Sequence, residues 1–133
     1  MKNDILSLFD TEKASESGAW LHLKLPTGEL AYLDGDSKKK PLRIRLKGPD
    51  SPEWQAYIRK ARTSTEELDP DTESQREAEL YASMTLEVQN IPEYTGENAR
   101  PLSELYAKHK EIRAQCTQFL FNRQAFFKAA QSS

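Results

Sequence analysis

The first third of the chain alternates apolar and polar positions with the period of a β-strand. Leu21 and Leu23 are separated by His22, so the two leucines share one face of a half-buried strand. Turn-forming residues at 26–29 and 34–36 interrupt the pattern. We therefore expect an antiparallel β-meander with one leucine-rich face. Its strands are predicted over residues 20–25, 30–33 and 42–47.

From residue 50 onward the apolar spacing becomes helical. Asp50 or Ser51 is a suitable N-cap for a helix over about 52–62. Leu80, Met84 and Val88 recur at the spacing of one helix face and predict a second helix that starts near Thr72 and ends before Asn90. A short helix opening at Pro101 and a long helix over about 108–129 follow. The predicted fold class is α+β, an N-terminal antiparallel three-stranded β-meander followed by about four α-helices.

Two polar segments flank or interrupt this pattern. Residues 1–18 are predicted to be a flexible N-terminal arm or a single helical turn docked on the body. Residues 19–130 are predicted to form a single α+β domain, with a polar acidic linker at about 63–76.

Composition adds a small core and a balanced charge. The 133 residues are 37% hydrophobic and 30% charged, with a formal net charge of −2. No apolar run reaches the roughly 18–20 residues of a membrane span, and an acid at Asp4 does not suit a signal peptide. The single cysteine, Cys116, fits a reducing compartment. We expect a soluble, cytoplasmic protein that has no membrane partner.

Catalytic and metal-binding motifs do not stand out. His22 reads as a surface or edge residue, Cys116 as a buried thiol, and Asp34 with Asp36 as turn residues. The glycines are too dispersed to cradle a phosphate. The sequence therefore predicts a protein that is not an enzyme, with no catalytic residues, cofactor or metal.

Six cations lie within residues 38–47, and Arg43 and Arg45 are expected on the sheet face opposite the leucines. This face is either solvated or a contact for an acidic protein partner. Nucleic acid is a less favoured partner, because no aromatic residue is interleaved with these cations and the acidic segment 66–79 can neutralise them.

Four of the five phenylalanines fall within nine residues of the last predicted helix. They either form core or, in part, a surface for self-association or for a client helix. The protein-binding residues proposed from this pattern, together with Arg43 and Arg45, are Tyr81, Met84, Tyr106, Phe119, Phe126 and Phe127.

An ordered series of short motifs runs along residues 18–127. They are Gly18-Ala19-Trp20, the turn at 26–29, Leu46-Lys47-Gly48-Pro49-Asp50-Ser51, Trp54, Leu80-Tyr81-Ala82, the segment 97–102, and the segments 118–123 and 126–127. In order and spacing the chain resembles the small tail assembly chaperones of long-tailed bacteriophages of siphovirus type, which are encoded just before the tape measure protein.

The resemblance implies a non-enzymatic function in the host bacterial cytoplasm. Such chaperones bind the tape measure protein, keep it soluble, help to recruit tail-tube subunits and are not part of the mature virion. The alternative is a structural tail or head–tail connector protein that is retained in the virion.

Overall fold

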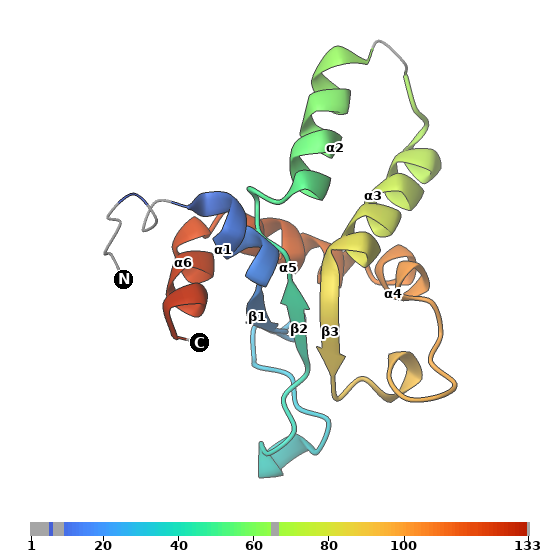
Figure 1. The fold of residues 1–133 in the computed structure, drawn as a ribbon. Coiled ribbons are helices and arrows are strands. Elements are labelled where there is room, and N and C mark those ends of the chain that lie inside the picture. The colour runs from blue at the N-terminus through green and yellow to red at the C-terminus, as the bar shows by residue number, and fades with distance from the viewer. Residues whose placement is uncertain (1–5, 7–9, 65–66, 133) are drawn as a thin grey trace.

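The computed structural model describes residue 6 and residues 10–64 and 67–132 (Figure 1). Within these residues, six α-helices accompany one three-stranded antiparallel sheet. The elements are α1 (Thr11–Ser17), β1 (Ala19–His22), β2 (Arg43–Leu46), α2 (Pro52–Thr63), α3 (Pro70–Met84), β3 (Thr85–Gln89), α4 (Leu102–Lys108), α5 (Lys110–Leu120) and α6 (Arg123–Ser132), with short 3-10 helices at Gly35–Ser37 and Pro92–Tyr94.

The predicted order of strands before helices is wrong. The sheet has the order β1-β2-β3, and its third strand follows α3 in the chain. A helix also precedes β1, and two helices separate β2 from β3. The protein is α+β, but its sheet is completed only when the chain returns to it at Thr85–Gln89.

The sequence predicted a helix where the structure has β3, because a helix and a strand both turn Val88 toward the core. Val88 lies four positions after Met84, as on one helix face, yet the structure pairs Val88 with Ile44 in β2. The helix stops at Met84, where Thr85 adopts an extended conformation and its hydroxyl donates to the Tyr81 carbonyl at 2.7 Å. The spacing of apolar residues therefore did not distinguish a helix from a strand at Val88.

The predicted strand over 30–33 is instead part of an irregular β1–β2 connection, residues 23–42. It carries two isolated bridges, Lys24 with Leu30 and Tyr32 with Pro41. The Ala31 N–H donates to the Leu23 carbonyl at 2.9 Å, and the Leu42 N–H donates to the Ala31 carbonyl at 3.1 Å. These contacts fold the connection back beside the sheet without a continuous ladder.

The predicted long helix over 108–129 is divided into α5 and α6. The break falls at Phe121 and Asn122, whose N–H groups donate to the carbonyls of Gln118 and Phe119 in a tight turn. The turn redirects α6 so that it packs against α1 (Figure 1). Phe126 of α6 thereby enters the same core as Leu120 of α5.

The helix predicted over 52–62 is confirmed as α2. Ser51 caps it by accepting from the Trp54 N–H at 3.4 Å, and Pro52 occupies the first turn. α2 has no buried residue. It extends away from the sheet (Figure 1). It contacts α3, where the Trp54 ring stacks on Tyr81 with centroids 6.4 Å apart.

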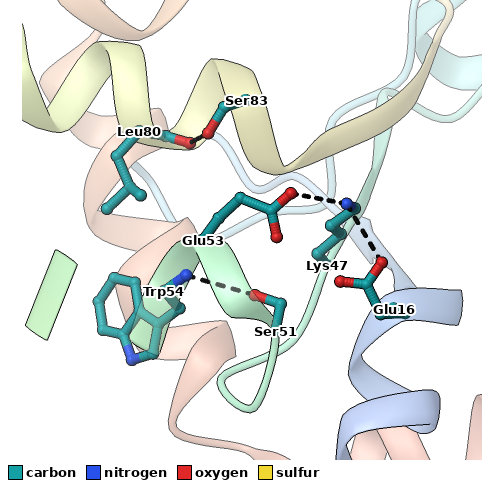
Figure 2. A network of polar contacts seen from close by, with 7 residues as sticks. All are labelled: Glu16, Lys47, Ser51, Glu53, Trp54, Leu80 and Ser83. Carbon is teal, nitrogen blue, oxygen red and sulfur yellow. Dashed lines mark hydrogen bonds and ion pairs between the residues drawn. The ribbon is translucent and has the colours of Figure 1, made fainter. Parts of the chain in front are cut away.

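One lysine joins the ends of α1 and α2. Lys47 Nζ lies 2.8 Å from Glu53 Oε2 of α2 and 3.3 Å from Glu16 Oε2 of α1 (Figure 2). The hydrogen bond with Lys47 lowers the pKa of Glu53, and the same bond raises the pKa of Lys47. In the part of the predicted arm that the structure describes, the chain therefore forms a helix held on the body.

The predicted acidic linker at 63–76 also contains the start of α3. The Asp69 carboxylate accepts from the Thr72 N–H at 2.8 Å and caps this helix, three residues before the cap expected from the sequence. Residues 65 and 66 lie outside the described residues. The assignment of 19–130 to a single domain stays a prediction.

Candidate protein-binding surface

The aromatic residues predicted to bind a partner lie mostly in the core. Tyr81, Met84, Tyr106 and Phe126 are at most 1% exposed. The Tyr81 and Tyr106 rings have centroids 5.8 Å apart. A partner can reach these four side chains only if the core opens.

The polar ends of the two core tyrosines are bonded inside the fold. The Tyr106 hydroxyl lies 2.6 Å from Thr85 Oγ1, and the Tyr81 hydroxyl is hydrogen-bonded to Thr117 Oγ1. Burial raises the pKa of both phenols well above the ordinary value. The hydroxyls thus remain protonated and act as internal links between helices and sheet.

The two other predicted phenylalanines are partly buried. Phe119 packs on Phe126 with ring centroids 5.2 Å apart, and Phe127 is half-buried on α6. Phe121, which is not among the predicted binding residues, is 78% exposed at the turn between α5 and α6. The phenylalanine concentration is therefore largely core, with Phe121 as its exposed member.

Arg43 and Arg45 lie on the sheet face opposite Ile44 and Leu46, and the register places Trp20 beside them. The Arg43 guanidinium lies 4.5 Å from the Trp20 ring centroid and donates to Gln89 Oε1 at 2.9 Å. Arg45 donates to the Ser17 carbonyl at 2.7 Å. The linear sequence did not reveal this aromatic neighbour, and both arginines make contacts within the chain.

An open apolar groove lies elsewhere, between the β1–β2 connection and the start of α5. We call it the leucine groove; its volume is about 380 Å³. Its apolar wall residues are Leu23, Leu25, Pro26, Ala31, Leu42 and Ile112.

Hydrogen bonds fix the two walls of the leucine groove relative to each other. The Lys24 N–H donates to Gln115 Oε1 of α5 at 2.8 Å, and Gln115 Nε2 donates back to the Lys24 carbonyl at 2.7 Å. Within the connection, which forms one wall, the Leu23 N–H donates to the Leu42 carbonyl at 2.9 Å. The groove is therefore a formed feature of the fold, although the connection is irregular.

The rim of the leucine groove is mainly cationic. Its charged and titratable residues are Lys24, Lys108, His109, Lys110 and Glu111. Lys108 Nζ lies 2.7 Å from the Glu104 carboxylate, and this hydrogen bond raises the pKa of Lys108. The Glu111 carboxylate accepts from Gln115 Nε2 at 3.2 Å.

The β1–β2 connection also exposes apolar side chains, of which Leu25 lines the groove. Leu25 is 47% exposed, Leu30 46% and Leu33 47%. The sequence pattern placed Leu25 on the leucine-rich face of a meander, and Leu30 and Leu33 in its returning strand, so it did not predict the groove. The only sequence signal was the position of Leu25 directly before a Pro-Thr-Gly turn, where a strand ends.

A second cleft, of about 460 Å³, lies between α2 and α3. Tyr57 and Leu68 contribute to it, but Lys60, Glu73 and Glu79 line it as well. Its mixture of both charges gives no clear preference for one kind of ligand.

The catalytic candidates weighed in the sequence occupy structural positions. His22 Nε2 lies 2.9 Å from the Ala31 carbonyl, and its ring meets Tyr32 edge to face at 4.9 Å. Burial raises the pKa of the Cys116 thiol to about 12, which keeps it protonated. Among the described residues, no group of three or more His, Cys, Asp or Glu side chains is arranged to hold a metal ion.

Comparisons with protein-family models, with curated proteins and with solved structures found no match to this chain. In the part of the chain that the structure describes, no helix has the length and apolar character needed to cross a membrane.

Proposed function

We propose that this protein is a non-enzymatic phage tail assembly chaperone that binds the tape measure protein and supports tail-tube assembly. The observation that carries the proposal is the leucine groove, an open apolar site with a cationic rim. The order of sequence motifs from Gly18 to Phe127 supports the choice of client.

A helical client needs a surface that covers its apolar stripe. The exposed leucine side chain of Leu25 and the partly buried side chains of Leu42 and Ile112 offer such a surface without opening the core. Burial of one leucine side chain contributes about 1.5–3 kcal/mol. A groove of this size therefore suits reversible binding of a short amphipathic segment.

The expected setting is the cytoplasm of the host bacterium, and the protein is expected to be absent from the mature virion. Mass spectrometry of purified virions tests this part of the proposal. Stoichiometric amounts of the chain in the particle would instead support the structural tail or head–tail connector alternative.

The main test is co-expression with the tape measure protein encoded downstream. The wild-type chain should keep the client in the soluble fraction and co-purify with it. Leu25→Ser should weaken this rescue about tenfold or more, because one apolar wall residue is lost.

Leu33→Ser is the matched control. Leu33 has the same exposed fraction as Leu25, 47%, and lies on the same connection, but it is not part of the groove wall. It should rescue the client like the wild type. The absence of rescue and of co-purification by the wild-type chain contradicts the proposed function.

A further inference from the structure

The charges around the leucine groove indicate which client segments it accepts. Lys24 and Lys110 stand on its two walls, one on the β1–β2 connection and one at the first residue of α5. We propose that the groove binds an acidic amphipathic segment of the client, in which an apolar side chain enters the groove and flanking carboxylates reach these two lysines. This inference rests on the proposed function.

The two lysines are held at a fixed separation by the fold. Gln115 bonds both the N–H and the carbonyl of Lys24, at 2.8 and 2.7 Å. Gln115 belongs to α5, the helix that Lys110 begins. The lysine backbones therefore do not need to be ordered when a ligand binds, which reduces the entropic cost of recognition.

Of the acids near the rim, Glu104 is paired with Lys108 at 2.7 Å. The Glu111 carboxylate accepts from the neutral Gln115 amide at 3.2 Å and keeps its charge, so Lys24 and Lys110 together give the rim its excess of positive charge. Within the described residues, no ion pair joins Lys24 or Lys110 to a carboxylate. An incoming acid thus meets these two cations without displacing a partner of the described chain.

The helix ends at the groove add no net preference for charge. The positive end of the α5 dipole lies at Lys110, and the negative end of the α4 dipole lies beside it at Lys108. Each exposed ion pair strengthens binding about two- to fivefold, and two of them about tenfold, at low salt. This part of the affinity should fall as salt shortens the screening length.

The probes are two labelled synthetic peptides that share one amphipathic helix pattern of leucines. One peptide carries glutamates beside the leucine stripe, and the other carries lysines at the same positions. Fluorescence anisotropy with the full 133-residue chain measures both affinities. The glutamate peptide should bind about tenfold more tightly at low salt, and the difference should shrink at high salt.

A charge swap tests the two lysines directly. The double variant Lys24→Glu with Lys110→Glu should reverse the preference, so that the lysine peptide binds more tightly. Arg59→Glu with Arg62→Glu is the matched control, since it makes the same change in net charge at exposed positions of α2. This control should keep the preference for the glutamate peptide.

Three outcomes would overturn the inference. They are equal binding of the two peptides by the wild type, no binding of either peptide, and a groove-dependent dimer that the Lys24 and Lys110 swap dissociates. In each case the wild-type chain can still solubilise the tape measure protein, and that result leaves the proposed function standing. The opposite combination is also informative. If the peptide preference reverses with the lysine swap but the wild-type chain does not keep the tape measure protein soluble, the inference stands and the proposed function is contradicted.

Discussion

The aromatic core and the β1–β2 connection use large apolar side chains in opposite ways. In the core, Tyr81, Tyr106 and Phe126 are at most 1% exposed and belong to helices α3, α4 and α6. In the connection, Leu25 and Leu33 remain 47% exposed. Both regions are apolar, but of the two only the connection leaves large apolar side chains exposed to solvent.

The contrast shows that abundance of large apolar residues does not identify a binding surface. The C-terminal phenylalanines are close together in the sequence because several of them pack in or against the small core. The leucines of the connection are more widely spaced, and some of them line an open groove. A small domain buries its aromatic residues first, because each contributes the largest apolar area. Large apolar side chains that stay exposed outside the core are the better indication of a binding surface.

The largest expected effect separates core phenylalanine from exposed phenylalanine. Phe126→Ala should lower the free energy of unfolding by about 3–5 kcal/mol, because it leaves a cavity beside Phe119 and Gly48. Urea denaturation followed by circular dichroism measures the change. Phe121→Ala, at a residue 78% exposed, should stay within about 0.5 kcal/mol of the wild type.

This pair also tests whether the C-terminal phenylalanines form core or a binding surface. If Phe126→Ala retained wild-type stability but lost client binding, Phe126 would belong to the binding surface rather than to the core.

The next effect concerns the close packing of α1 and α6 on the loop after β2. A Cβ on Gly48 would lie 2.6 Å from Ser15 Oγ and 2.8 Å from Phe126 Cδ1. Gly48→Ala should therefore cost about 1–3 kcal/mol of stability. Thermal and urea unfolding measure it.

A double-mutant cycle serves as the control for Gly48. In a Phe126→Leu background the contact with the aromatic ring is absent, so Gly48→Ala should cost less than in the wild type. Equal costs in both backgrounds would show that the ring contact is not responsible.

A smaller effect is expected where the β1–β2 connection is attached to the helices. Gln115→Ala removes both hydrogen bonds to Lys24 and should cost about 1 kcal/mol. Amide hydrogen exchange at Lys24 should accelerate, and affinity for the glutamate peptide should fall. Gln118→Ala, at an exposed position of the same helix, is the control and should leave the exchange rate and the peptide affinity unchanged. If exchange at Lys24 is unchanged in Gln115→Ala, other contacts hold the connection.

The smallest effect is a pH dependence at the junction of α1 and α2. The pKa of Glu53 is lowered by Lys47, so this pair stabilises the fold above the unfolded pKa of the carboxyl and loses the contribution as pH falls through the folded value. The raised pKa of Lys47 gives a contribution present below its unfolded pKa and lost as pH rises through the folded value. Lys47→Met should cost about 0.5–1 kcal/mol near neutral pH, since the pair is partly exposed.

Denaturation at neutral and acidic pH checks this prediction. The difference between Lys47→Met and the wild type should shrink in acid. A difference that is the same at both pH values would assign the effect to lost packing of the lysine stem.

The sequence predicted local structure well where a chemical signal marks the boundary. Ser51 and Pro52 located the start of α2, and Pro101 located the start of α4. Boundaries without such a signal were missed. Met84 to Thr85 changes from helix to strand with no glycine or proline, and Leu120 to Asn122 breaks a helix in an otherwise helical sequence.

The candidate site was harder to predict than the elements. Lys24 and Gln115 are 91 residues apart in the chain, and their mutual hydrogen bonds join the connection to α5, a contact that no local pattern in the sequence reveals. Likewise Trp20 lies over Arg43 through strand pairing, a neighbour that charge counting along residues 38–47 did not include.

The sequence by itself determined the α+β composition, the caps that begin α2 and the amphipathic faces that build the core. Only the tertiary structure decided that β3 completes the sheet, that Phe126 of α6 turns inward and that three leucines of the connection stay exposed. The physical reason is that periodicity fixes which residues share a face of an element. It does not say which faces meet, because that depends on contacts between segments far apart in the chain.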